Sequence, residues 1–306
     1  MPEISNYKEK SIFSEALNLV DNLIVDIVEF TSIKKIHILR NYKLKKQNLK
    51  KVTYHLTGPN KNIFSILKSF PKNLPVILVA PESKGIGYKI FEEINKDFFL
   101  LHSNGEMVKL FSSKRQTFKL LKKKKIPCVP EKQPNQIKKN FIIIKPEYGA
   151  GSEKLYYCRN STATIPPEMM CQEYFSGKKA SFSMICIKGQ FLVLGCNLHI
   201  IKKKKRRITQ IGSLIGGAEK YRSDFELLAT EISQKFLGLF GFIGIDVVMI
   251  KGRWHVMEIN CRFTSTYIGL KKVYGKEIIK SIFDLYFNNI LNCSKLIVRG
   301  KKKIIF

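Results

Sequence analysis

Two apolar runs near the end of the sequence each carry one carboxylate. Asp246 lies in GFIGIDVVMI and Glu258 lies in WHVMEIN, and only the letters KGR separate the runs. Two apolar runs joined by a short loop with a glycine are typical of a β-hairpin. The pairing of this hairpin decides whether the two carboxylates meet.

A loop over Lys251 to Arg253 sets one pairing of the two strands. The facing pairs are then Ile250 with Trp254, Val248 with Val256 and Asp246 with Glu258. Facing residues on one side of a sheet have Cβ atoms ~5 Å apart. The alternative is a longer turn, which slips the register by one residue and turns Asp246 toward solvent.

Asn260 and Arg262 extend the face of Glu258, because strand side chains repeat every two residues. Paired carboxylates in an apolar hairpin are unfavourable unless a cation neutralises them. All-oxygen ligands suit Mg²⁺, especially when phosphates complete its shell. We therefore predict a metal site from Asp246, Glu258 and Asn260. Arg262 would hold a carboxylate or a developing phosphoryl charge, although an arginine after a strand is also common on surfaces.

Lys145 ends the apolar run FIIIKP and precedes the glycine loop YGAGSEKL. Glycines let backbone amides approach a phosphate closely. The loop matches neither the Walker A pattern nor GxGxxG, and an ordinary hairpin turn with an exposed lysine explains it equally well. Gln172 and Glu173 end another apolar run, MMCQEYFSG, where main-chain groups could read an adenine edge. An ordinary strand end is the alternative.

The elements that would position these residues follow from periodicity and from helix and turn signals. Residues 1–110 read as an α/β lobe, with a helix over 11–30 that Ser11 could cap, a helix at 60–69, and strands in KKIHILR, KVTYHL and PVILVAPES. A helix starts at Ser113 and closes before Pro127. From residue 141 strands and glycine loops dominate, and SDFELLATEISQKFLGLF reads as a helix with a capping box from Ser223 to Glu226.

Composition separates several classes of protein. The chain has 306 residues, is 44% hydrophobic, and carries 54 Lys and Arg against 24 Asp and Glu, a formal charge of +30. The charge alone suggests a polyanion partner. The lysines are spread along the chain beside many Ile and Asn, however, and no aromatic platform accompanies them, so nucleic acid is the less favoured partner. A positive field also suits an enzyme that binds phosphates and carboxylates.

Seven cysteines occur, and none falls in a CxxC pair, which favours reduced packing thiols over disulfides or zinc. No stretch approaches the ~20 apolar residues of a membrane span. The first residues do not form a signal peptide, because acidic and polar residues interrupt them. We therefore expect a cytoplasmic protein without a membrane partner.

In chain order, these motifs resemble the ATP-grasp superfamily. They are Lys114 at the start of its helix, IIIKPEYGAGS, CQEYFSG, GIDVVMI and MEINCRFTS. The resemblance spans nearly the whole chain, is most secure over residues 110–275, and is most specific in Asp246 with Glu258-x-Asn260-x-Arg262. LVAPESKGIG, GKKASFS and EINCRFTSTYIGL look most like the tyramine/glutamate ligases of methanofuran-type cofactor biosynthesis.

The resemblance implies an α/β (α+β) ATP-grasp fold, in which residues 111–306 follow the N-terminal lobe as lobes 111–175 and 176–306. It implies ATP with Mg²⁺ or Mn²⁺ held by Asp246, Glu258 and Asn260, and Arg262 and Lys145 as catalytic groups. The residues that it assigns to the nucleotide are Lys114, Lys145, Gly149, Gly151, Ser152, Gln172, Glu173, Tyr174, Phe175 and Ser181. Two departures stand out. An acidic residue for the ribose is missing near Lys179 to Ser181, and Cys261 replaces a usual proline.

The implied activity is ligation of a carboxylate to an amine through an acyl phosphate, with glutamate and tyramine or tyrosine as small-molecule substrates. His199, Arg206, Arg207 and Thr264 are candidates for the acceptor pocket. A homodimer would agree with the superfamily. One alternative is a ligase that adds glutamate to another cofactor or to a protein. Another is a nucleic-acid-binding protein on a degenerate scaffold, whose steeply salt-dependent binding would survive loss of the carboxylates.

Overall fold

The computed structural model describes residues 7–59, 61–80, 85–138, 141–149, 155–159, 165–204, 207–292 and 296–305, with side chains from residue 14 onward. The first helix, α1 (Tyr7–Phe30), buries Leu19, Leu23 and Ile27 along one stripe. The predicted helix is therefore confirmed, but Ser11 cannot start it, because α1 is already helical from Tyr7.

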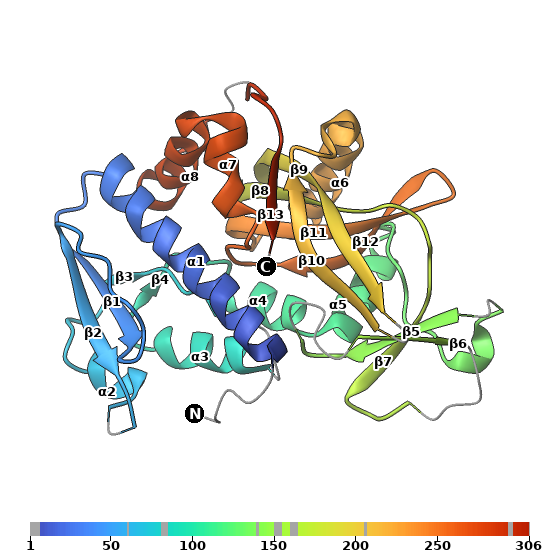
Figure 1. Ribbon diagram of the computed structural model, residues 1–306, viewed down its shortest axis with the longest axis horizontal. Coiled ribbons are helices and arrows are strands. Elements are labelled where there is room, and N and C mark those ends of the chain that lie inside the picture. Colours follow the sequence, from blue (N-terminus) through green and yellow to red (C-terminus); the bar gives the residue numbers. More distant parts are fainter. Residues whose placement is uncertain are drawn as a thin grey trace.

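The N-terminal lobe is a set of short elements at one end of the molecule (Figure 1). Strands β1 (Ile36–Asn41) and β2 (Val52–Thr57) pair in parallel, as do β3 (Pro75–Val76) and β4 (Phe99–Leu100). Its helices are α2 (Ile63–Leu67), α3 (Ile86–Ile94) and α4 (Gly105–Ser112). The strand predicted in PVILVAPES is shorter than expected, with two strand residues in its described part.

One large sheet forms the rest of the scaffold. Its strand order is β12-β11-β8-β9-β10-β6-β5-β7, β13 pairs with β10, and every neighbouring pair is antiparallel. The strands are β5 (Phe141–Pro146), β6 (Tyr156–Arg159), β7 (Met169–Glu173), β8 (Lys179–Ile187), β9 (Gln190–Lys204), β10 (Arg207–Ile215), β11 (Phe240–Ile250), β12 (Arg253–Asn260) and β13 (Lys302–Ile305). Strands β5–β7 lie at the end of the molecule opposite to β1 and β2 (Figure 1).

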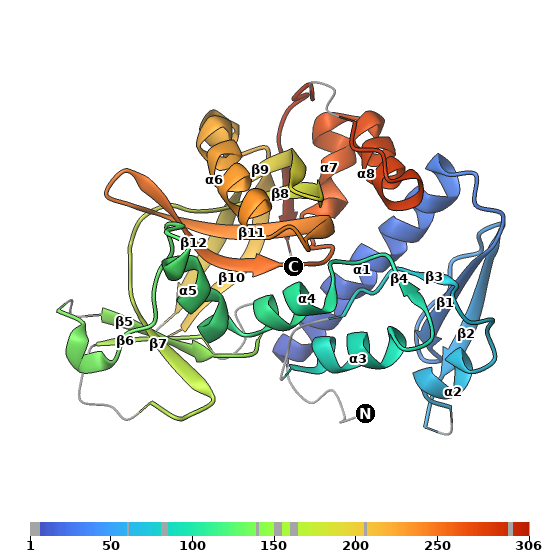
Figure 2. The same ribbon diagram turned by 180° about the vertical axis from the view of Figure 1, so that it is seen from behind.

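Helices cover both faces of the central strands because the strand side chains alternate. On β8, Phe182 and Met184 join one buried cluster with α5 (Lys114–Lys123) and α6 (Arg222–Lys235). Ile185 points to the other face, into a cluster with α1, α7 (Tyr267–Tyr274) and α8 (Lys276–Asn288). Figure 2 shows α5 between β12 and the β5–β7 strands. The apolar stripe of α1 therefore shares its core with the C-terminal helices.

The helix signals succeeded in one place and failed in another. Ser113 caps α5, and its hydroxyl accepts a hydrogen bond from the amide of Gln116 at 3.2 Å. The predicted capping box of α6 is wrong, because α6 begins at Arg222 after Tyr221, which makes no side-chain cap. Ser223 is therefore inside the first turn.

Two features that the sequence analysis considered are the state of the cysteines and the length of the apolar helices. The six cysteines that the structure describes stand outside any disulfide, and Cys171, Cys186, Cys196 and Cys261 are buried. Within the described ranges, the longest apolar helices fall short of what a bilayer crossing requires. The expected boundary at residue 110 lies in α4, and we keep the division into 1–110 and 111–306 as a proposal.

Candidate active site

The β11–β12 hairpin brings Asp246 opposite Glu258, as predicted, but by a different route. The turn contains only Lys251 and Gly252, with φ of 48° and 80°. A left-handed backbone at both positions is what the favoured two-residue hairpin turn requires. Ile250 therefore pairs with Arg253, and the predicted pairing with Trp254 is wrong.

A bulge beyond the turn corrects the register. Val247 pairs with Val256, whereas Asp246 pairs with Glu258, so Met257 is an extra residue on β12. The predicted partner of Val256, Val248, pairs with the neighbouring histidine instead. A shorter turn and an extra residue cancel each other. The carboxylates consequently face one another, and Asn260 lies opposite Gly244.

Each carboxylate has a basic neighbour from another strand or helix. The Lys114 Nζ lies 3.0 Å from Glu258 Oε1 and donates to the Gly149 carbonyl oxygen at 2.6 Å. The His199 Nε2 lies 3.3 Å from Asp246 Oδ1, without hydrogen-bonding geometry to any described group. Lys114 thus joins the start of α5, the glycine loop and the hairpin at one point.

Lys145 is buried beside Lys114, at the end of β5. Burial lowers its pKa to about 8, and the charge of Lys114 acts in the same direction, against the opposing charges of Glu258 and Asp246. Its ammonium lies 5.3 Å from the centre of the Phe118 ring. A buried ammonium next to a second one needs a nearby anion to stay charged. The site is therefore suited to a phosphate chain.

A pocket between β5, β7, β9 and β11 contains most of the predicted nucleotide residues. Its lining includes Lys114, Lys145, Gly149, Gln172, Glu173, Tyr174, Phe175, Asp246 and Glu258. Apolar side chains such as Ile143, Ile201 and Met257 line it as well, which suits a flat base. Gly151 and Ser152 lie outside the described residues.

The side chains at the end of β7 are occupied by protein partners. The Gln172 amide donates to the Val129 carbonyl oxygen, and the Lys132 ammonium lies 3.2 Å from the Glu173 carboxylate. The main-chain groups of Gln172 and Glu173 are therefore what the strand end offers to a base, and the adenine contact stays a prediction.

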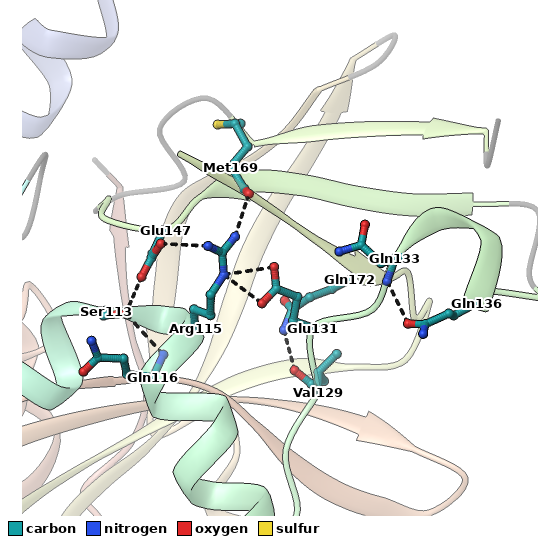
Figure 3. A network of polar contacts seen from close by, with 10 residues as sticks. All are labelled: Ser113, Arg115, Gln116, Val129, Glu131, Gln133, Gln136, Glu147, Met169 and Gln172. Atoms are coloured by element: carbon teal, nitrogen blue, oxygen red, sulfur yellow. Dashed lines mark hydrogen bonds and ion pairs between the residues drawn. The ribbon is translucent and has the colours of Figure 1, made fainter. Parts of the chain in front are cut away.

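Arg115, which the sequence analysis missed, connects α5 to the β5–β7 strands (Figure 3). Its guanidinium lies 2.9 Å from Glu131, 3.3 Å from Glu147 and 3.1 Å from the Met169 carbonyl oxygen, to which it donates. The Ser113 hydroxyl donates to Glu147 at 2.5 Å. These bonds fix the start of α5, and so hold Lys114 against the pocket. Its position directly after Lys114 was the available signal.

A second missed residue is Lys179, which lines the pocket where an acidic ribose contact was expected. Burial, and secondly the charge of Lys203, lower its pKa to about 8. Its ammonium donates to the Phe175 carbonyl oxygen at 2.9 Å. Ser181 is not among the residues that line the pocket, although it pairs with Asp246 across the sheet; its hydroxyl receives a weak hydrogen bond from Asn197 at 3.5 Å.

Arg262 lies just outside the pocket, beside the predicted metal ligands. Its guanidinium donates to Asn260 Oδ1 at 3.4 Å and to the Phe263 carbonyl oxygen at 3.1 Å. Its buried Nε has no hydrogen-bond partner among the described residues. The guanidinium thus keeps donor capacity for an anion that binds next to Asn260.

The acceptor candidates do not form one group. His199 lines the nucleotide pocket, and Arg207 is exposed at the start of β10. Thr264 follows β12, where its hydroxyl lies 2.8 Å from that of Thr266. Arg206 lies outside the described residues.

The residues fit a nucleotide with a divalent cation. Asp246, Glu258 and Asn260 offer the hard oxygen ligands that Mg²⁺ prefers. Among the described residues no group of three His, Cys, Asp or Glu side chains could hold a metal ion by itself, so such an ion would need phosphate oxygens to complete its shell. The two lysines opposite supply the positive charge for those phosphates.

Residues 111–266 match the ATP-grasp domain family. Tyramine–L-glutamate ligase from Methanocaldococcus jannaschii is 23% identical over 309 residues, which cover 97% of this chain and 90% of that protein. The ligase of the same name from Methanocaldococcus fervens is 24% identical over 277 residues, which cover 87% of this chain and 86% of that protein.

A solved structure has the same fold. The biotin carboxylase domain of Hydrogenobacter thermophilus 2-oxoglutarate carboxylase, solved with MgADP, ADP and bicarbonate, superimposes with a TM-score of 0.73 at 14% identity. The match covers 93% of this chain and 71% of that one. A likeness at this identity shows the arrangement of the strands and helices.

Proposed function

Because the chain belongs to the ATP-grasp family, we propose that it is an ATP-dependent ligase that joins a carboxylate to an amine. The proposed pair is the γ-carboxyl group of glutamate and the amine of tyramine or tyrosine. The two curated relatives are both named tyramine–L-glutamate ligase, and each matches most of this chain. The observation that carries the proposal is the meeting of Lys114, Lys145, Asp246 and Glu258 in one pocket.

The reaction forms an acyl phosphate from the carboxylate and ATP, and the amine then displaces phosphate to give the amide. When bound, Mg²⁺ supplies positive charge at the reacting phosphates. Lys114 and Lys145 neutralise the phosphate chain in a site of low polarity, where fixed charges act strongly. Asp246, Glu258 and Asn260 would hold the ion, and Arg262 would stabilise charge on the acyl phosphate.

The first test is release of ADP with Mg-ATP, glutamate and either tyramine or tyrosine. Glu258→Gln keeps the shape of the side chain but removes the charge, and should lower turnover by roughly 10²- to 10³-fold. Glu231→Gln, at a half-exposed carboxylate on α6, is the matched control and should leave turnover unchanged. Absence of amine-dependent ADP release from the wild type with every amino acid and amine pair would refute the proposed function.

The alternative acceptor is a longer acidic chain on a cofactor or protein. The exposed lysines Lys202, Lys203 and Lys204 at the end of β9 would suit such an acceptor. A panel that compares tyramine with glutamate-containing peptides decides between the two. Turnover with the peptides alone would favour the alternative.

A further inference from the structure

A carboxylate on α1 reaches the far side of the same site. Leu19, Leu23 and Ile27 form the buried stripe of α1, and Glu15 precedes Leu19 by four residues, so it continues that stripe. Glu15 is half-buried, although a charged group is costly there. Its position therefore needs a reason.

Polar contacts fix the position of α1 on α7. The Tyr267 hydroxyl donates to Asp26 Oδ2 at 2.8 Å, and the Lys271 ammonium donates to Asp26 Oδ1 and to Glu29, each at 2.8 Å. Asp26 is buried, so these contacts set the rotation of the helix. They hold the Glu15 turn of α1 against the segment between β12 and α7.

That segment is residues 261–266, the loop that follows the predicted metal strand. The Ser265 hydroxyl hydrogen-bonds the Glu15 carboxylate, which also interacts electrostatically with Arg262 and Asp246. Burial raises the pKa of Glu15 above its usual value, while Ser265 and Arg262 oppose the rise. Within the described part of the chain, Glu15 forms no salt bridge.

The groups around Glu15 leave it as an acceptor for a cation. Arg262 donates to Asn260 and to a carbonyl oxygen, so part of its donor capacity is already used. Burial lowers the pKa of His102 to about 4, and the charge of Arg262 acts in the same direction, so this neighbour of Arg262 is neutral at neutral pH. Thr264 and Thr266 add hydroxyls that lie 2.8 Å apart.

We propose that Glu15 binds the ammonium group of an amino substrate and holds that substrate beside Arg262. The proposal rests on the proposed ligase function, since that reaction needs an amine next to the activated carboxylate. Asp246 and Glu258 are assigned to the metal, which leaves Glu15 as the carboxylate near Arg262 for this task. Arg262 links the two sides, because it contacts Asn260 and interacts with Glu15.

The ammonium group has two possible sources, the acceptor amine and the α-amino group of glutamate. Glu15→Gln keeps the size of the side chain and a group that can accept from Ser265, but it removes the charge. The expected result is a rise of at least about tenfold in the KM of one amino substrate, with the KM of ATP within about twofold of wild type. Glu231→Gln, at the half-exposed carboxylate on α6 that pairs with Lys235, is the control and should change neither KM.

Glutarate, which lacks the α-amino group of glutamate, separates the two sources. If Glu15 binds the acceptor, the KM of tyramine rises and the preference for glutamate over glutarate is retained. If it binds glutamate, Glu15→Gln loses that preference and the KM of tyramine is unchanged. Hydroxylamine is a small nucleophile that is mostly uncharged at neutral pH. If Glu15 binds the acceptor amine, hydroxylamine should support ADP release equally well in the wild type and in Glu15→Gln.

A structural role for Glu15 gives a different pattern. Glu15→Asp keeps the charge on a shorter side chain and should raise the same KM less than Glu15→Gln does. Equal rises in both variants, a parallel rise in the KM of ATP, or unchanged KM values for both amino substrates would overturn the proposal. If the wild type is active and Glu15→Gln is unaffected, only the proposed role of Glu15 is refuted. If the wild type shows no amine-dependent turnover, both the ligase function and the role of Glu15 are refuted.

Discussion

The nucleotide side and the α1 side of the site are built in different ways. The nucleotide side comes from neighbouring antiparallel strands, and its central pair, Asp246 and Glu258, lies within one hairpin. On the α1 side, Asp26 meets Tyr267 across 241 residues of sequence, and Glu15 meets the loop that ends at α7. Local pairing therefore fixes the groups for phosphate and metal, while long-range packing positions the second side.

Arg262 belongs to both sides, so its loss should have a large effect, second to that of Glu258→Gln. If the guanidinium acts on developing charge, Arg262→Ala should raise the activation free energy by about 2 kcal/mol or more, which lowers turnover roughly 30-fold or more. The affinity for ATP should change little, because Arg262 does not line the nucleotide pocket. Steady-state kinetics with a separate measurement of ATP binding decide this. Equal losses in both quantities would contradict the assigned role.

Lys145 tests the nucleotide side alone. Its pKa in the ligand-free protein is about 8, below the usual value near 10.4 for lysine. The folded protein binds the proton less well than the unfolded chain, so this group makes unfolding harder as pH rises from about 8 to about 10. ATP binding has the opposite trend, because the ammonium is lost over the same range.

We therefore expect the affinity for ATP to fall by about tenfold per pH unit above pH 8. The fall should end at the pH at which Lys145 loses its proton in the ATP complex as well. Titration calorimetry from pH 7 to pH 9.5 measures it. Lys145→Met should bind ATP weakly at every pH and lose most of this dependence. A wild-type slope that persists unchanged in the variant would assign the titration to another group, of which Lys179 is the first candidate.

Asp26 tests the α1 side without touching the pocket. Asp26→Asn weakens the contacts to Tyr267 and Lys271, which should cost about 1–3 kcal/mol of unfolding free energy. We also expect a rise of about threefold in the KM of one amino substrate, since Glu15 would lose its fixed position, and little change for ATP. Denaturant unfolding and kinetics measure the two effects. A larger effect on ATP than on the amino substrates would mean that α1 supports both sides.

The sequence predicted the nucleotide side better than the α1 side, because the first depends on local pairing and the second on long-range packing. The alternation of apolar and polar residues in GFIGIDVVMI and WHVMEIN predicted that Asp246 and Glu258 share a face, and the expected three-residue loop paired them only because the shorter turn and the bulge cancel. It could not show the bulge, because Met257 is an ordinary apolar residue in an apolar strand. The helical period of α1 was also visible, but it does not reveal that Glu15 meets a loop 250 residues further along the chain.

The turn of the hairpin provides the smallest effect, and it asks how far the nucleotide side depends on local geometry. Gly252 has φ of 80°, and no atom lies within 4 Å of a Cβ added there, so Gly252→Ala would act through backbone strain alone. The cost should be about 1 kcal/mol of unfolding free energy, measured by denaturant. Lys251→Asn is the converse change, because asparagine tolerates the left-handed backbone of Lys251 better than lysine does.

Neither turn variant should alter the KM of ATP by more than about twofold, because the bulge at Met257 separates the turn from the carboxylates and fixes their register independently. If Gly252→Ala raised the activation free energy of turnover by more than it lowered the free energy of unfolding, the turn itself would be setting the register. The nucleotide side would then depend on the two ends of one hairpin acting together, rather than on the bulge next to Asp246.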